Sequence, residues 1–425
     1  MRVRRGAGWT VAAVLATVAA LTRMGAGGTA QHRGDPAVES RILAETIEAF
    51  ETRWAEDPGN PVIGAGLIDR HLMMFRLDDD LAHLDRAESI AARLAPLSLD
   101  GAGAHARLSA ARLARHDFSG AWSSAEAAVG VDERSASALG AMFDAALATG
   151  RYQRAEEARV ALERHHQGTL SQRVRTARWF DATGDSERAV AMLGDLCDRL
   201  AGRAVRRQTV AWCEGLLAGM ELGTAGASAA RRRFARVLDI QPGYMAGIEG
   251  LADLAYAGGD RERALRLYRE ILSDTHPDLY LRVAEIERAL GNDSAARAAE
   301  SRFLRLATGP DAERLNAHPL AIHLAGDPRT RDEALAVIER DLERRPSVET
   351  WEVAAWVRLQ RGELDEALAA SDASRGWGTA TATGDYIRGR ILLRLGRVEE
   401  GERLVTAASA RRAELAHHVL LEIGV

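Results

Sequence analysis

The feature that most constrains the fold is a repeat of about 34 residues. One small residue, which we call the anchor, marks each unit, and five of the nine spacings between successive anchors are 34 residues long. The anchors are Ala87, Ala121, Ala155, Ala189, Ala230, Ala264, Ala296, Ala334, Ala367 and Gly401. Six of the ten positions five residues before an anchor are glycine: Gly150, Gly184, Gly259, Gly291, Gly362 and Gly396. Since only 39 of 425 residues are glycine, chance would place about one glycine there, so the repeat is real.

Each unit is predicted to form two helices joined by a turn that contains the glycine. Glycine adopts a positive φ without steric cost, so it ends the first helix, and a following Asp or Asn caps the second. Apolar residues recur at helical spacing in 251–256 and 264–271. Pro242 and Pro346 each follow an anchor by twelve residues, where the second helix is expected to end. Because one hairpin cannot bury its apolar stripe alone, neighbouring hairpins must stack.

These units resemble the tetratricopeptide repeat family of helix-turn-helix solenoids. The family's pattern has a turn glycine, an apolar residue two positions later, the anchor alanine, and often a further aromatic residue and a proline. Phe234, Pro242 and Tyr268 match this pattern best, whereas Glu300 stands where an aromatic residue is expected. The resemblance covers about residues 61–415 and implies an all-α, right-handed α-solenoid of about ten helix-turn-helix repeats. It says almost nothing about activity, because a fold does not fix a function.

The N-terminal segment, residues 1–30, has the pattern of a signal peptide. A short positive head is followed by thirteen apolar residues, Trp9 to Leu21, and by small residues at 28–30. Thirteen residues are too few to span a bilayer as a helix. We therefore expect cleavage and export to the periplasm or the extracellular space of a bacterium-like cell. The alternatives are an uncleaved inner-membrane anchor, which would be the chain's only membrane contact, and a wrongly assigned start codon.

Two further parts complete the predicted domain organisation. Residues 37–60 are expected to form an N-terminal capping helix, with Ile42, Ile47, Phe50 and Trp54 at helical intervals, and residues 61–425 to form the solenoid. Within the solenoid, the composition of residues 376–384 predicts a surface loop.

Composition and charge exclude several classes of function. The formal charge falls from −5 to −9 when the four arginines of residues 1–30 are removed, which disfavours a nucleic-acid partner. All 56 basic residues are arginine, and without lysine there is no phosphate-loop lysine, Schiff base or Ser–Lys dyad. The histidines have poor spacing for a metal site, since they form adjacent pairs at 165–166 and 417–418, and His318 and His323 are five residues apart. We therefore expect no catalysis, no cofactor and no metal.

The two cysteines, Cys197 and Cys213, are predicted to lie on neighbouring helices of adjacent units. An exported protein meets an oxidising environment, which permits a disulfide between them. Two buried free cysteines are the alternative, because free cysteine behaves as a small apolar residue in helical cores.

The working surface is expected on the concave face formed by the first helices. The family's inward positions map onto Asp144, Arg178, Asp181, Trp212, Glu249, Asp253, Tyr256, Glu285, Trp356, Tyr386 and Arg390. Glu249, Asp253 and Glu285 would gather beside Tyr256 as an acidic patch. Trp356, Tyr386 and Arg390 would form a second, aromatic and cationic region. The alternative is that the carboxylates only keep the surface solvated.

These observations predict a scaffold without catalytic activity that binds a peptide or a partner protein's helix in the concave groove. A mildly acidic groove fits a basic or amphipathic partner best. The alternative function is a ligand or glycan sensor that uses Trp356, Tyr386 and Trp377 for stacking. A pentatricopeptide-type RNA binder would need a basic inner face, and an enzyme would need a nucleophile, base and oxyanion site that the sequence does not supply.

Overall fold

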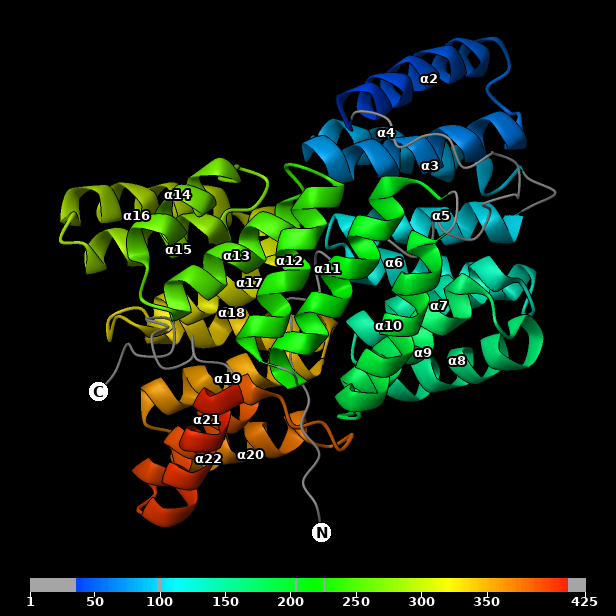
Figure 1. Ribbon diagram of the computed structural model, residues 1–425. Helices are drawn as coiled ribbons and strands as arrows, with labels where there is room; N and C mark the ends of the chain where they lie inside the picture. Colours follow the sequence, from blue (N-terminus) through cyan, green and yellow to red (C-terminus); the bar gives the residue numbers. More distant parts are fainter. Residues whose placement is uncertain (1–35, 98–100, 203–204, 225, 412–425) are drawn as a thin grey trace. The chain divides into compact units, whose positions relative to one another are not determined.

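The computed structural model describes residues 36–97, 101–202, 205–224 and 226–411, and every secondary-structure element in these ranges is an α-helix (Figure 1). The described residues divide into two compact units. One comprises 36–179 and 192–210, and the other comprises 180–191 and 211–411. The expected signal segment lies outside the described residues, as does the chain after Arg411.

Within the described ranges, the helices follow one another as one leading helix and ten consecutive pairs, so the prediction of an all-α repeat fold is confirmed. The bounds are α2 (Pro36–Glu56), α3 (Pro61–Asp78), α4 (Leu81–Leu94), α5 (Gly101–Ala114), α6 (Phe118–Val131), α7 (Ala136–Ala148), α8 (Tyr152–His166), α9 (Leu170–Ala182), α10 (Ser186–Ala201), α11 (Arg207–Thr224), α12 (Ala227–Ile240), α13 (Met245–Ala257), α14 (Arg261–Glu270), α15 (Asp278–Ala289), α16 (Asp293–Ala307), α17 (Pro310–Ala325), α18 (Arg331–Arg344), α19 (Val348–Arg361), α20 (Leu364–Ser374), α21 (Ala382–Arg394) and α22 (Val398–Arg411).

The turns between paired helices have the backbone conformation that the repeat requires. All six turn glycines have positive φ, from 71° at Gly150 to 85° at Gly184. In the α5–α6 turn His116 takes the same region with φ 58°, although it is not glycine. After Gly259, the Asp260 side chain accepts a hydrogen bond from the Arg263 backbone N–H at 3.2 Å and so caps α14. These turns set the two helices of a pair antiparallel and in contact.

The anchors are packed in the interior of the helix pairs. All ten are buried, and the nine alanines are fully inaccessible. At the last anchor, an added Cβ on Gly401 would lie 2.8 Å from the carbonyl oxygen of Gly389. The crossing of α21 and α22 therefore has room only for glycine. Pro242 and Pro346 follow the ends of α12 and α18, as their lack of a backbone N–H requires.

One helix departs from regular geometry. Asn316 in α17 has φ −118° and ψ 20°, and Pro319 lies three residues further on inside the same helix. The proline ring clashes with the carbonyl of the fourth residue before it, which kinks a helix. This kink falls in the repeat between the anchors Ala296 and Ala334, which are 38 residues apart.

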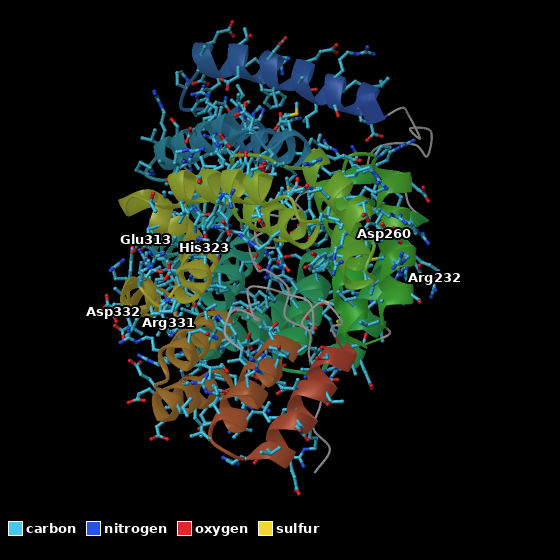
Figure 2. All side chains as sticks on the ribbon, turned by 90° about the vertical axis from the view of Figure 1, so that its left-hand side faces the viewer. Arg232, Asp260, Glu313, His323, Arg331 and Asp332 are labelled. Carbon is cyan, nitrogen blue, oxygen red and sulfur yellow. The ribbon has the colours of Figure 1, made fainter. Side chains whose placement is uncertain are left out.

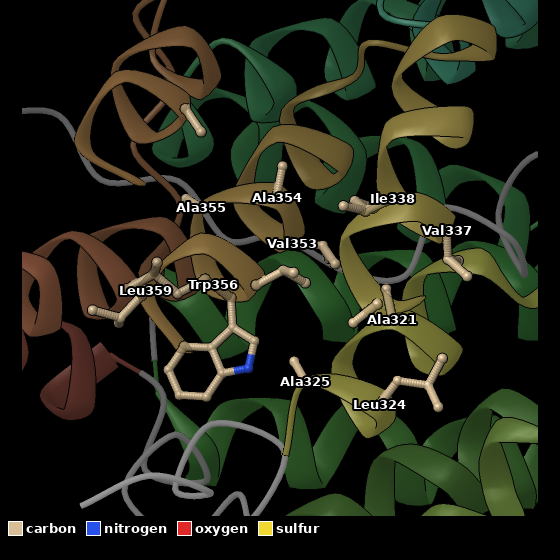
Figure 3. Close-up of a cluster of buried hydrophobic side chains, with 14 of the residues drawn as sticks. Ala321, Leu324, Ala325, Val337, Ile338, Val353, Ala354, Ala355, Trp356 and Leu359 are labelled. Carbon is tan, nitrogen blue, oxygen red and sulfur yellow. The ribbon is translucent and has the colours of Figure 1, made fainter. Parts of the chain in front are cut away.

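Each unit has its own apolar core. In the first unit, Leu43, Ile47 and Trp54 of α2 pack with Leu67 and Ile68 of α3. In the second unit, the core around α17 to α21 includes Val337, Ile338, Val353 and Trp356 (Figure 3). First helices of neighbouring pairs also contact one another, as α3 with α5 and α17 with α19. The stacked pairs thus bury the apolar stripe that one hairpin cannot cover alone.

Many charged side chains are exposed on the described helices. Arg232, Asp260 and Asp332 are exposed and point outward from the second unit (Figure 2). Every cationic side chain apart from histidine is a guanidinium, since the sequence has no lysine. Within the described ranges, no helix is both long enough and apolar enough to cross a membrane.

Candidate functional site

The strongest candidate site is a group of polar side chains on three successive helices of the second unit. We call it the central cluster, and its members are Glu249, Asp253 and Tyr256 of α13, Tyr268 of α14, and Arg282 and Glu285 of α15. It contains the predicted acidic patch, and the structure brings the residues of that patch together with Tyr256. Helical spacing explains this, because residues three and four apart on α13 share one face.

Two tyrosine hydroxyls organise the carboxylates of the central cluster. Tyr256 donates a hydrogen bond from its hydroxyl to Oε1 of Glu285 at 2.6 Å. Tyr268 donates from its hydroxyl to Oδ1 of Asp253. Tyr268 and Glu285 are buried, whereas Glu249, Asp253 and Tyr256 are half-buried. The half-buried carboxylates are the part of the cluster that a ligand can reach.

Burial and mutual repulsion shift the pKa values in this cluster. Desolvation, followed by repulsion from Asp253 and Asp278, raises the pKa of Glu249 to about 7. Burial, followed by the charge of Asp253, raises the pKa of Tyr268 well above its usual range. At neutral pH, Glu249 is therefore divided between its protonated and ionised forms, and a cation placed beside it would favour the ionised form.

Sequence reasoning missed two members of the cluster as site residues: Tyr268, which it placed only in the repeat pattern, and Arg282. Burial alone would lower the pKa of Arg282, but Tyr268, Asp253 and Glu285 outweigh burial and raise the pKa of the guanidinium. Arg282 lies three residues before Glu285 on α15, so helical spacing was a signal that could have found it. The cluster thus has three carboxyl groups and one internal cation, which leaves an excess of negative charge.

Asp144 and Arg178 form a closed ion pair in the first unit. Nη1 of Arg178 lies 2.6 Å from Oδ1 of Asp144, and Nη2 of Arg175 lies 2.6 Å from Oδ2 of the same carboxylate. All three side chains are at least nine-tenths buried. Arg175 also donates to the carbonyl oxygen of Gly140 at 3.1 Å. This group holds α7 and α9 together rather than presenting charge to a partner.

Asp181 and Trp212, two further predicted inward positions, are also engaged within the fold itself. Asp181 accepts a hydrogen bond from the Ser186 hydroxyl at 2.8 Å, across the turn between α9 and α10. Trp212 on α11 is buried. Neither residue lies in the central cluster as we define it.

The predicted aromatic and cationic region near the C-terminus is wrong as a binding surface. Trp356 is only 1% exposed and lies inside the apolar core (Figure 3), and Tyr386 belongs to the same core. Arg390 is half-buried and donates a hydrogen bond to the Tyr386 hydroxyl at 2.9 Å. These positions face neighbouring helices of the stack. Trp377 is 43% exposed, whereas Trp356 and Tyr386 are buried. The three aromatic side chains therefore do not form the shared stacking pocket that was expected for a glycan sensor.

Cys197 and Cys213 are joined by a disulfide, and both side chains are fully buried. No group of three or more His, Cys, Asp or Glu side chains within the described part of the chain is placed to hold a metal ion.

No protein-family model and no curated protein matches this sequence. Among solved structures, the APC/C hetero-tetramer Cut9–Hcn1 is similar at 14% identity and a TM-score of 0.41, with 91% of this chain and 82% of that chain covered. The human IFIT1 dimer with PPP-AAAA is similar at 12% identity and a TM-score of 0.46, with 76% and 73% covered. A tetratricopeptide repeat protein from Parabacteroides merdae is similar at 16% identity and a TM-score of 0.33, with 59% and 96% covered. These similarities concern the fold alone, and the hairpins, turn glycines and buried anchors described above identify the fold as a tetratricopeptide-type helical repeat.

Proposed function

We propose that this protein is a scaffold without catalytic activity that binds an extended peptide or a partner's helix along its first helices. The central cluster would receive an arginine or lysine side chain of that partner. The observation that carries the proposal is the position of Glu249 and Asp253, two half-buried carboxyl groups one helical turn apart, with Arg282 as the internal cation beside them. A partner's cation would supply the charge that this cluster lacks.

The surroundings of the cluster favour such a contact. Tyr256 and Tyr268 orient two of the three carboxylates by hydrogen bonds, so the cluster is ordered before a ligand arrives. An ordered site loses less conformational entropy on binding than a flexible one. Charge-assisted hydrogen bonds are stronger than neutral ones, and arginine can engage a carboxylate with two of them.

We infer that the partner is a protein or peptide rather than a nucleic acid. Support comes from the net negative charge of the chain and from the buried arginines of the first unit, which Asp144 already engages. We further propose that the protein is exported. Support for export comes from the composition of residues 1–30 and from the disulfide, since disulfides persist in oxidising compartments.

A peptide array tests the proposed function. Immobilised arginine-containing peptides, each beside a copy with glutamine at every arginine, are probed with the purified chain and with the double variant Glu249→Gln/Asp253→Asn. The matched control is Glu262→Gln/Glu270→Gln, which removes the same formal charge from exposed positions on α14.

We expect a set of arginine peptides to bind the wild-type chain and the control, and to bind the cluster variant about tenfold or more weakly. Equal losses in both double variants would mean that only net charge matters. Equal binding of all three proteins would place the contact elsewhere and overturn the role of the cluster. A single-stranded RNA oligonucleotide that binds at physiological salt would contradict the assignment to a protein partner.

A further inference from the structure

The loop between α20 and α21 touches the turn between α9 and α10, although 197 residues separate the two contacting positions. The Thr379 hydroxyl donates a hydrogen bond to the carbonyl oxygen of Ala182, the last residue of α9, at 2.7 Å. The last carbonyls of a helix have no partner inside that helix, so a side chain from elsewhere can engage them. Both segments belong to the second unit, and five helix pairs, α11–α12 to α19–α20, lie between them in the sequence.

The α9–α10 turn is covered, unlike the other turns of its kind. Of the six turn glycines, Gly184 alone is buried, whereas Gly150 is half-buried and the other four are exposed. An added Cβ on Gly184 would lie 3.5 Å from the carbonyl oxygen of Gly378, so the two backbones lie against each other. On the side of the loop, Thr379 and Ala380 are each 5% exposed, in a segment whose composition predicts a surface loop. The loop therefore packs on the turn instead of extending into solvent.

The loop is also fixed to the helices on its own side of this contact. The Thr381 hydroxyl, which caps α21, donates a hydrogen bond to Glu352 of α19. The carbonyl oxygen of Ala380 accepts a hydrogen bond from Nη1 of Arg411 on α22 at 3.2 Å. The loop is thus held to these helices, and separation of Thr379 from the α9–α10 turn requires the helices to move with it.

We propose that the loop at 376–381 is a clasp that joins the two ends of these five helix pairs, closes them into a ring and fixes their curvature. In a repeat array the curvature is the sum of small rotations between neighbouring repeats, so a stretch with unjoined ends changes its curvature through small shifts at each interface. The central cluster lies on α13 to α15, within the ring. The clasp therefore sets the spacing of the first helices there, whether or not that cluster receives a partner.

Hydrogen–deuterium exchange on the full chain tests the clasp against a matched turn of the same unit. The amides of Gly184 and Asp185 donate to the carbonyl oxygens of residues 181 and 180 at 3.1 and 2.7 Å. In the α13–α14 turn, the amides of Gly259 and Asp260 make the equivalent two bonds at 2.9 Å each. The two turns thus differ in cover rather than in backbone hydrogen bonding. After correction for intrinsic rates, we expect the covered turn to exchange about tenfold more slowly than the exposed one.

Two substitutions at Thr379 weaken the clasp to different degrees. Thr379→Val keeps the shape of the side chain but removes the hydroxyl, and should reduce the difference between the two turns by about threefold or more. Thr379→Arg places a long charged side chain in the buried contact and should abolish that difference. The matched control is Thr308→Val, which removes a hydroxyl that donates to the Leu304 carbonyl oxygen at 2.6 Å at the end of α16. It should leave both turns unchanged. Equal exchange of the two turns in the wild-type chain, or a difference that persists in Thr379→Arg, overturns the clasp.

Pulsed electron paramagnetic resonance measures whether the ends of the ring separate. The native cysteines are bonded to each other, so spin labels react at the substitutions Glu187→Cys on α10 and Ala373→Cys on α20. Both positions are exposed and belong to the second unit. We expect one narrow distribution of distances between the labels, which Thr379→Arg should broaden at least about twofold towards longer distances. A distribution that Thr379→Arg leaves unchanged would show that the loop does not hold the ends together, and would also overturn the proposal.

Discussion

At the scale of single residues, the turn glycines and anchors were predictable and the exposure of first-helix side chains was not. A positive φ favours glycine and a close helix crossing favours a small residue, so the repeat reveals both kinds of position. Trp356 shows why exposure fails. On α19 nearly every residue from Val353 to Leu359 is buried, because a first helix contacts its pair mate and its neighbours in the stack. Helical periodicity does not show which faces of a first helix contact its neighbours and which face would line the expected groove.

Gly401 gives the first prediction at this scale. We expect Gly401→Ala to lower the free energy of unfolding by about 1–3 kcal/mol, because the new Cβ would overlap the Gly389 carbonyl oxygen and force α21 and α22 apart. The matched control is Gly130→Ala in α6, where nothing lies within 4 Å of an added Cβ. There alanine should be neutral or stabilise the helix by up to about 1 kcal/mol. Thermal unfolding followed by circular dichroism compares them, and equal effects would contradict the close crossing.

Glu249 gives a second prediction, which concerns pH. Its pKa is raised from 4.5 to about 7, so the folded state holds the proton more tightly than the unfolded chain. Stability from this group is therefore complete below 4.5 and is lost as pH rises through about 7. Glu249→Gln cannot ionise, so we expect it to raise the melting temperature relative to wild type at about pH 8 and to change it little at about pH 5. The same shift at both pH values would show that ionisation is not the cause.

At the scale of helices, the pairing and most boundaries followed from the sequence, whereas two local features did not. Residues 376–384 look like a loop by composition, yet α21 already begins at Ala382, because the Thr381 hydroxyl accepts from the Gly384 N–H at 2.8 Å and caps the helix. In α2, Ile42 is 49% exposed, and Leu43 packs into the core in its place. Side-chain caps and the exact rotation of a terminal helix depend on contacts that periodicity does not encode.

The disulfide between α10 and α11 leads to a prediction at this scale. It closes a segment of fifteen residues between Cys197 and Cys213, which in the chain-entropy model stabilises the fold by about 3 kcal/mol. Under denaturing, non-reducing conditions we expect no free thiol, and two after reduction. Reductant should lower the melting temperature of the wild-type chain and have no effect on Cys197→Ser/Cys213→Ser. Two thiols before reduction would disprove the bond.

At the scale of the whole molecule, stacked hairpins give stability that is local rather than shared by every residue. Each unit has its own apolar core, one around α2 to α5 and another around α17 to α21. In repeat arrays each element is stabilised chiefly by its immediate neighbours. We therefore expect urea unfolding to give different midpoints when measured by hydrogen exchange in α3 and in α19. Coincident midpoints would instead indicate that the cores unfold in one cooperative step.

The absence of lysine from the sequence has a practical consequence for chemistry performed on this protein. Acetylation, isopeptide tagging and amine-directed cross-linkers all act on the lysine side chain, which the exterior does not offer. A cross-linking search for the partner should therefore activate the exposed carboxylates, of which Asp260 and Asp332 are examples, and let the partner supply the amine. A covalent product would then identify the partner's lysines directly, with no lysine of this chain to compete.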